Sequence, residues 1–134
     1  TTPGGRYDGD TFADGSVSPV QGMDRNGPLA VLQSAMRLPQ SDYMATLFNM
    51  KFHPSALKTH EDLVKLSNMV KTYLTNGGKQ IQFNVVDKKI LEEAKHDKEK
   101  YRDLIVRVAG YSAYYVTLTE RVQDEIIART EQMI

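Results

Sequence analysis

The chain has 134 residues, no cysteine, and 17 acidic against 17 basic side chains, so its formal net charge at pH 7 is zero. This length suits one domain, and the balanced charge favours neither nucleic acid nor an anionic membrane surface as a partner. Without cysteine, these residues can supply no disulfide, thiolate zinc site or cysteine nucleophile. The sequence has no long apolar run and no secretory signal pattern, so we expect a cytoplasmic protein with no membrane span.

Residues 1–27 form the first distinct part of the sequence, because they are rich in Gly, Pro, Asp and Ser. This composition is typical of loops, and it carries little helical or strand periodicity. A leader of this length without secondary structure is uncommon inside a small domain. We therefore expect a loop-rich segment that is either disordered or wraps other parts of a larger fold.

Residues 28–134 alternate between helical and extended patterns, which indicates an α/β arrangement. The clearest helical pattern begins with a possible capping box between Thr59 and Asp62 and stops at a pair of glycines. Two further residues, Asp87 and Thr119, are candidate helix caps. The expected helices, with caps and stops, cover residues 28–38, 59–78, 88–97 and 120–133, and the expected strands cover 46–52, 79–86, 103–109 and 111–118.

Most individual side chains are interpreted as structural. We expect the three histidines, His53, His60 and His96, to be surface or packing residues, because they show no metal-ligand spacing. Apolar stripes on two helices and three tyrosines are expected to pack into a core. These residues are Leu63, Leu66, Val70, Tyr73 and Leu74 in one helix, Val122, Ile126, Ile127 and Thr130 in the other, and Tyr111, Tyr114 and Tyr115.

Gly110 stands out in the stretch "VRVAGYSAYYV", because no other glycine follows Gly78. A glycine inside a strand pattern marks a bulge, a tight bend or a close approach of another backbone. On this pattern alone, the chain could be a small α/β binding module in which Gly110 only makes a bend.

A longer set of motifs resembles one family. The stretch "RVAGYSAYYV", preceded by "EKYRDLIV" and followed by "LTERVQDEIIARTE", is similar to the C-terminal glycyl-radical segment of the glycyl radical enzymes. Three further stretches resemble successive parts of that region in the same order: "DGDTFADGSVSPVQGMDRNGPLAVLQSAMRLP", "FNMKFHPSAL" and "GGKQIQFNVVD". The forms "RVAGYSAY" and "KFHPSAL" look more like the dehydratase, decarboxylase and C–N lyase branch than pyruvate formate-lyase.

The resemblance implies a fold and a role for Gly110. The fold would be the C-terminal part of a ten-stranded α/β barrel, with residues 1–27 threading the barrel and residues 28–134 forming the glycyl-radical domain. The radical loop would lie between short strands, followed by a C-terminal helix. Gly110 would store a main-chain radical, and its neighbours would keep the loop tip buried and dry.

The resemblance also implies partners. A radical SAM activating enzyme, using S-adenosylmethionine and a 4Fe–4S cluster, would install the radical, while this chain itself would bind no cofactor or metal. A larger chain would carry the catalytic cysteine, and the chemistry would be oxygen-sensitive and anaerobic. The activating enzyme would recognise the residues around the glycine, namely Arg107, Val108, Ala109, Tyr111 and Ser112.

Two functions follow from the resemblance. The chain is either the radical-storing portion of a glycyl radical lyase or dehydratase, or a stand-alone spare part that restores an oxygen-damaged glycyl radical enzyme. In both cases we expect no turnover by this chain alone, because it lacks cysteine.

Overall fold

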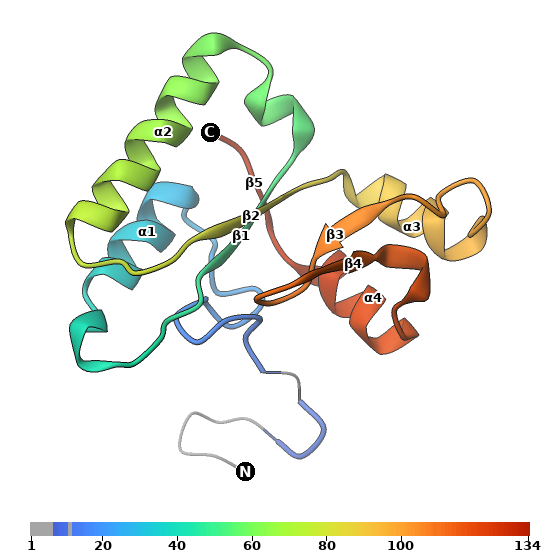
Figure 1. The fold of residues 1–134 in the computed structure, drawn as a ribbon, viewed down its shortest axis with the longest axis horizontal. Coiled ribbons are helices and arrows are strands. Elements are labelled where there is room, and N and C mark those ends of the chain that lie inside the picture. The colour runs from blue at the N-terminus through green and yellow to red at the C-terminus, as the bar shows by residue number, and fades with distance from the viewer. Residues whose placement is uncertain (1–6, 11) are drawn as a thin grey trace.

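A parallel three-stranded sheet lies at the centre of the structure, a computed structural model that describes residues 7–10 and 12–134 (Figure 1). Its strand order is β2–β1–β5, and β1 pairs in parallel with both neighbours. A second sheet is the antiparallel hairpin of β3 and β4. The strands are β1 (Asn49–Phe52), β2 (Gln82–Val85), β3 (Ile105–Arg107), β4 (Ser112–Tyr114) and β5 (Glu131–Gln132).

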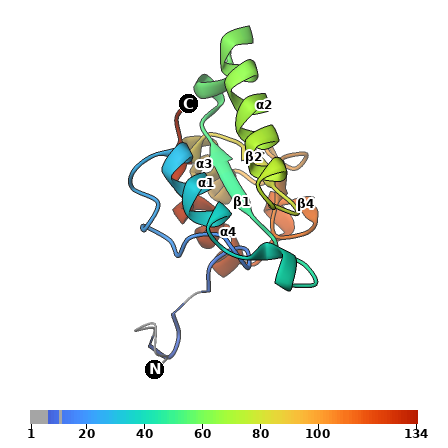
Figure 2. The same cartoon turned by 90° about the vertical axis from the view of Figure 1, so that its left-hand side faces the viewer.

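Helices lie in two groups on either side of the central sheet. Figure 2 shows α1 and α2 in front of β1, with α3 and α4 behind it beside the β3–β4 hairpin. The helices are α1 (Pro28–Met36), α2 (His60–Thr75), α3 (Lys88–His96) and α4 (Glu120–Ala128). Short 3₁₀ helices cover Gln40–Asp42, Pro54–Leu57 and Tyr115–Thr117. Within the described part of the chain, no helix combines the length and apolarity needed to cross a membrane.

The ends of α2 follow the sequence signals. Thr59 accepts a hydrogen bond from the Asp62 backbone N–H, and the Asp62 carboxylate accepts one from the Thr59 N–H, which confirms the capping box. At the other end, the Gly78 N–H donates to the Tyr73 carbonyl at 3.0 Å, and the Gly77 N–H donates to the Leu74 carbonyl at 3.4 Å. These two bonds form a Schellman motif, and Gly77 takes the positive φ of 94° that it requires. Asp87 also caps α3, as predicted.

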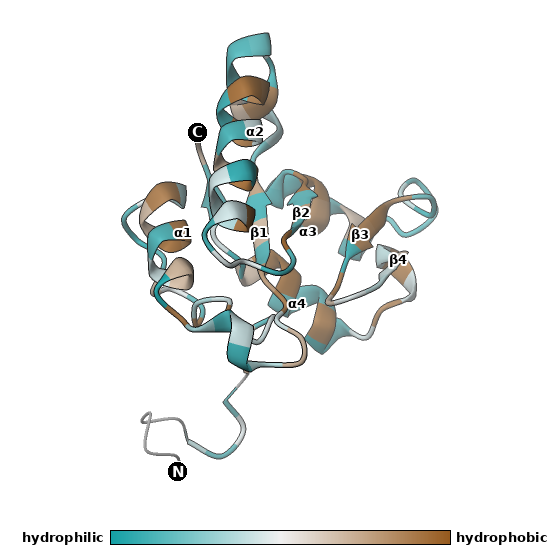
Figure 3. Ribbon diagram, turned by 60° about the vertical axis from the view of Figure 1, so that its left-hand side comes forward, coloured by the Kyte–Doolittle hydropathy of each residue, from teal (hydrophilic) through white to brown (hydrophobic). Residues whose placement is uncertain are grey.

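The two faces of the central sheet differ in chemistry, because side chains alternate along each strand. One face is apolar and packs against α1 and α2. Phe52 is fully buried there, and Tyr73 of α2 packs against Phe48, with ring centroids 5.1 Å apart. Figure 3 shows hydrophobic residues interspersed with hydrophilic ones along both of these helices. The opposite face carries buried or half-buried polar residues, namely Asn49, Lys51, Gln82, Asn84 and Glu131. We call this second side the polar face of the sheet.

A second apolar core lies beyond the polar face. It joins α3, α4 and the hairpin through buried side chains that include Leu91, Val106, Tyr115 and Ile126. The polar face therefore lies between two separate hydrophobic cores, and the contacts across it are hydrogen bonds and ion pairs.

The end of the last helix differs from the prediction. The pattern predicted a helix over 120–133, but α4 ends at Ala128, and Arg129 has an extended ψ of 136°. Glu131 and Gln132 then pair with Lys51 and Phe52 as β5. A helical pattern is local, whereas β5 exists because the edge of β1 offers it hydrogen bonds from a distant part of the chain. Thr119 is the N-cap residue of α4, but its side chain makes no capping hydrogen bond.

Two further predictions were partly wrong. The strand expected over 111–118 ends at Tyr114, since Tyr115 begins a 3₁₀ turn. In α2, Tyr73 is buried as predicted, but Leu63 and Leu74 are 51% and 46% exposed. The side of α2 that packs on the sheet is centred on Met69 and Tyr73, so the predicted stripe lies to one side of it. The described residues confirm an α/β arrangement with a parallel sheet; the ten-stranded barrel stays a prediction.

Candidate functional site

Gly110 lies in the turn of the β3–β4 hairpin. Arg107 pairs with Ser112, and the Val108 N–H donates to the Tyr111 carbonyl at 2.9 Å, which leaves Ala109 and Gly110 as the two turn residues. Gly110 has φ 74°, a left-handed conformation that glycine adopts without the strain other residues incur. The bend predicted for Gly110 is therefore present.

The tip of this hairpin is exposed. Gly110 is exposed to solvent, and a Cβ placed on it would meet no atom within 4 Å. The expectation that neighbouring residues bury the tip was wrong for this chain. The hairpin packs through Val106 and Val108, which point toward the second core, while its turn projects past that core. Any shelter for Gly110 has to come from outside the described residues.

The hairpin brings all the residues predicted around Gly110 together. Arg107 and Ser112 face each other across the strands, with Nη1 of Arg107 3.2 Å from Oγ of Ser112. Tyr111 is 54% exposed. Val108 is buried at 8% exposure, and Ala109 is half-buried. Tyr111 and Ser112 therefore offer exposed side chains, while Arg107 is half-buried like Ala109.

The polar face of the sheet holds the β3 strand. Asn84 Oδ1 accepts a hydrogen bond from the Arg107 N–H at 2.7 Å, and Asn84 Nδ2 donates to the Arg107 carbonyl at 2.6 Å. The Arg107 side chain donates from Nε to Gln82 Oε1 at 2.6 Å. Two polar residues of β2 therefore fix both the main chain and the side chain of Arg107.

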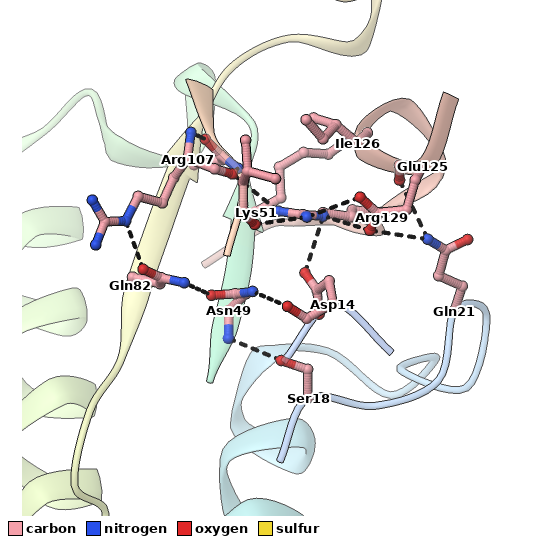
Figure 4. Close-up of polar contacts among 12 residues, drawn as sticks. Asp14, Ser18, Gln21, Asn49, Lys51, Gln82, Arg107, Glu125, Ile126 and Arg129 are labelled. Atoms are coloured by element: carbon pink, nitrogen blue, oxygen red, sulfur yellow. Dashed lines mark hydrogen bonds and ion pairs between the residues drawn. The ribbon is translucent and has the colours of Figure 1, made fainter. Parts of the chain in front are cut away.

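Arg129 contacts the hairpin from the other side (Figure 4). Its Nη1 donates to the Arg107 carbonyl at 3.1 Å and its Nη2 to the Val108 carbonyl at 2.8 Å. Nε and Nη2 each lie 3.0 Å from an oxygen of Glu125, and Nε also lies 3.0 Å from Asp14 Oδ2. The guanidinium is therefore buried among two carboxylates and two carbonyl oxygens of the hairpin.

Asp14 links the N-terminal segment to this network. Burial raises the pKa of the Asp14 carboxyl, and the nearby Arg129 cation partly offsets that rise. The same segment lies along the sheet, because the Asn49 N–H donates to Ser18 Oγ at 3.0 Å and the Val17 N–H donates to the Leu47 carbonyl at 3.1 Å. Residues 12–26 thus form tertiary contacts, while residues 1–6 and 11 lie outside the described part, and threading through a larger barrel stays a prediction.

Lys51 is a second buried cation on the polar face. Its Nζ lies 3.2 Å from the Ile127 carbonyl at the end of α4 and 3.6 Å from the Glu131 carboxylate. Burial lowers the pKa of the Lys51 ammonium, and Glu131 opposes this shift. Lys51 therefore ties the last turn of α4 to the sheet, close to Arg129.

The three tyrosines near Gly110 separate into different environments. Tyr115 is fully buried, and its hydroxyl has no hydrogen-bond partner among the described residues. Burial raises the pKa of Tyr115 to about 12. Tyr111 and Tyr114 are at least half exposed, so their predicted core positions were wrong. The hairpin is too short to bury both of its sides, and only the side facing α3 and α4 is covered.

His53 lies close to two carboxylates, which its position in the sequence did not predict. Side-chain atoms of His53, Asp87 and Glu131 lie within 4.8 Å of one another. His53 and Asp87 follow the carboxyl ends of β1 and β2, and Glu131 is the first residue of β5. Each group already has protein partners: the His53 Nδ1 accepts from the Ser55 N–H, and Glu131 accepts from the Lys88 N–H. Because a neutral His53 that accepts at Nδ1 carries its proton on Nε2, it points a donor toward Asp87.

Asp14, Asn84 and Arg129 were not predicted from the sequence. The alternation of polar and apolar residues in "FNMKF" and "QIQFNV" is the signal that could have revealed the polar face. No local pattern identifies Arg129 or Asp14, because their contacts join residues that are far apart in the chain.

Comparison with known proteins shows the family to which the chain belongs. Residues 13–116, which include the whole loop around Gly110, match the family described as glycine radical. The chain belongs to the glycine radical family. The resemblance inferred from the motifs is thereby confirmed.

Relatives of this glycine radical chain are decarboxylases and dehydratases. It is 45% identical over 130 residues to an indoleacetate decarboxylase of Tractidigestivibacter scatoligenes, covering 97% of this chain and 15% of the relative. It is 43% identical over 131 residues to a trans-4-hydroxy-L-proline dehydratase of Clostridioides difficile, covering 98% of this chain and 16% of the relative. The chain therefore spans only a small part of the length of these proteins.

Solved structures show the same fold. A glycerol-bound B12-independent glycerol dehydratase from Clostridium butyricum matches with a TM-score of 0.91 at 50% identity, over 99% of this chain and 17% of the dehydratase chain. The hydroxyproline dehydratase from Clostridioides difficile, with its substrate bound, matches with a TM-score of 0.92 at 42% identity, over 100% of this chain and 17% of the other.

Proposed function

We propose that the chain stores an organic radical on the α-carbon of Gly110. The supporting observation is that Gly110 lies at the exposed hairpin tip inside the matched region, with open space in the direction of a Cβ. Removal of one α-hydrogen atom leaves one unpaired electron, which the adjacent amide nitrogen and carbonyl delocalise when the α-carbon is flat. A side chain would crowd that flat centre, so the chemistry requires glycine.

The hydrogen atom would be removed by a radical SAM activating enzyme that uses S-adenosylmethionine and a 4Fe–4S cluster. In this proposal, its recognition surface includes Arg107, Val108, Ala109, Tyr111 and Ser112. The exposed side chains of Tyr111 and Ser112 and the half-buried side chain of Arg107 support direct contact, whereas Val108 would contribute through its main chain, because its side chain is buried.

The radical would then pass to a cysteine in a larger portion of the enzyme. This chain has no cysteine and covers only 15% to 17% of the relatives described above, which supports a separate location for the substrate step. In the proposed assembly, the parallel sheet is part of a ten-stranded α/β barrel, and the exposed tip of the hairpin is sheltered by the rest of that barrel. The reaction would be a lyase or dehydratase reaction on a small substrate, run under anaerobic conditions.

Electron paramagnetic resonance tests the storage site. Anaerobic incubation with an activating enzyme should give a doublet, because one α-hydrogen remains on Gly110, and the doublet should collapse in protein made with α-deuterated glycine. Gly110→Ala should abolish the signal. Gly22→Ala is the matched control, because Gly22 also has a positive φ (80°) and open space around it. An unchanged doublet in Gly110→Ala would contradict the proposal.

Mixing experiments separate the two roles of the chain. The activated chain alone should turn over no substrate, and exposure to air should cleave it at Gly110, which mass spectrometry would detect. If the chain restores activity to an oxygen-cleaved full-length glycyl radical enzyme, it acts as a spare part. Turnover by the isolated chain would contradict the requirement for an external cysteine.

A further inference from the structure

We propose that Arg129 is a positioning residue for the radical loop, a role that rests on the proposed function of Gly110. The supporting feature is the pair of hydrogen bonds from one buried guanidinium to two successive carbonyls just before the turn, those of Arg107 and Val108. Arg129 touches neither Gly110 nor a substrate, so it acts through the peptide that leads into Gly110.

The geometry explains why these two bonds constrain the turn. Consecutive carbonyls of a regular strand point in opposite directions, so a single side chain cannot normally reach both. Arg129 reaches both at the end of the regular strand, because β3 ends at Arg107 and the bend of the turn begins at Ala109. A guanidinium that holds both oxygens therefore fixes the direction in which the chain leaves the strand, two residues before Gly110.

The guanidinium is itself held in one orientation. Glu125 accepts from Nε and Nη2, a two-point contact that fixes the guanidinium plane. Asp14 approaches Nε from the N-terminal segment. With only 8% of Arg129 exposed, these contacts are largely shielded from water and strengthened by the low local dielectric. A lysine at this position would keep the charge but could not serve all four groups in a plane.

The arrangement couples the radical loop to a distant segment. Asp14 precedes Arg129 by more than a hundred positions in the sequence, and its segment is fixed on the sheet through Val17 and Ser18. Displacing the segment from the sheet would remove one carboxylate from Arg129 and loosen its contact with the loop. The packing of residues 12–26 on the sheet therefore influences the mobility of the turn at Gly110.

Amide hydrogen exchange on the 134-residue chain tests this proposal without activation. Arg129→Lys and Arg129→Gln should accelerate exchange in peptides covering residues 105–114 by about 100-fold, because two bonds from a charged donor are lost. Exchange in α2, residues 60–75, should stay unchanged. Arg121→Lys is the matched control, since Arg121 is exposed on the same helix that carries Glu125.

Two results would overturn the proposal. An equal acceleration in α2 and the hairpin would mean that Arg129 supports only global stability. Wild-type exchange in Arg129→Lys would mean that positive charge alone suffices. If the Arg129 variants do not fold, Asp14→Asn serves as the milder change and should accelerate exchange in the hairpin by about 10-fold. Unchanged hairpin exchange in this variant would also overturn the proposal.

The lifetime of the electron paramagnetic resonance doublet tests whether Arg129 affects the radical. In Arg129→Lys, the anaerobic doublet should decay faster than in the unmodified chain, whereas Arg121→Lys should match the unmodified chain. Equal lifetimes in all three proteins would contradict an effect of Arg129 on the radical. If even the unmodified chain gives no doublet, the storage function of Gly110 fails, and the exchange experiment still decides whether Arg129 positions the loop.

Discussion

Asn84 in β2 and Arg107 in β3 are joined by two hydrogen bonds, in which the side-chain amide of Asn84 donates to the Arg107 carbonyl and accepts from its N–H. A side chain here replaces the main-chain pairing that a neighbouring strand would give. The β3–β4 hairpin is thereby attached to the central sheet even though the two sheets are separate. This attachment places the turn at Gly110 relative to the polar face.

Replacing Asn84 should loosen the hairpin. Asn84→Ala removes both bonds and leaves the partly buried Arg107 N–H without its acceptor, so we expect a loss of about 2 kcal/mol in the free energy of unfolding. Asn84→Asp keeps an acceptor but loses the donor, so its loss should be smaller. Urea denaturation measures both, and Asn68→Ala on the exposed side of α2 is the control, expected within about 0.5 kcal/mol of the wild type. An Asn84→Ala protein as stable as this control would refute the interpretation.

The two N-cap threonines, Thr59 and Thr119, should contribute differently to the free energy of unfolding. Thr59 accepts a hydrogen bond from the Asp62 N–H, whereas Thr119 occupies the N-cap of α4 without such a bond. Thr59→Ala should therefore lower the free energy of unfolding by about 1 kcal/mol, and Thr119→Ala by only about 0.3 kcal/mol. Thermal unfolding of the two variants side by side gives the comparison. Equal losses would show that the capping bond at Thr59 contributes nothing.

The glycine pair after α2 should respond to alanine for two different reasons. A Cβ on Gly78 would lie 2.4 Å from the ring of the buried Tyr73, so Gly78→Ala should cost about 2 kcal/mol through displacement of that ring. Gly77→Ala meets no atom but must adopt φ 94°, which should cost about 1 kcal/mol. In a Tyr73→Leu background, which removes the ring, Gly78→Ala should cost less than it does in the wild type. If Gly78→Ala costs the same in both backgrounds, the steric explanation is wrong.

Tyr115 should make the fold sensitive to alkali. Because burial raises its pKa from 10.0 to about 12, the folded state favours the neutral phenol. The stability due to this group is fully present below pH 10 and is lost as the pH rises from 10 toward 12, by about 2 kcal/mol. Tyr115→Phe should remove this loss, at little cost near neutral pH, since the hydroxyl has no protein partner among the described residues.

The exposed neighbour provides the control for this titration. Tyr114 is 50% exposed, so Tyr114→Phe should keep the alkaline loss of the wild type. Denaturant unfolding at pH 9 and pH 11 measures the difference. The same pH dependence in Tyr115→Phe and the wild type would assign the alkaline loss to other groups.

Local signals succeeded where the required contacts are near in sequence. The capping box at Thr59 and the glycine stop after α2 were predictable because each involves residues within one or two turns of a helix. The bend at Gly110 was predictable for the same reason, since a hairpin turn needs only the residues on either side of it. The motif around Gly110 further identified the family, which the match over residues 13–116 confirms.

Prediction failed where the partner lies far along the chain. The residues after Ala128 carry a helical pattern, but the edge of β1 recruits Glu131 and Gln132 into a strand. Leu63 follows the apolar period of α2, yet the sheet is placed against Met69 and Tyr73 instead. In both cases the deciding contact is with a residue far away in the sequence, and the periodicity of neighbouring residues cannot predict such a contact.

The sequence by itself determined the family, the bend at Gly110 and the order of most elements, because motifs, turns and helix ends depend on short-range chemistry. Only the tertiary structure decided that Arg129 and Asn84 bind the β3–β4 hairpin, that Asp14 pairs with Arg129, and that the hairpin tip is exposed. These residues come from opposite ends and the middle of the chain, and they meet because one sheet presents an apolar face to α1 and α2 and a polar face to the hairpin. A charged side chain becomes a specific contact only when folding has removed water from around it and placed its partners.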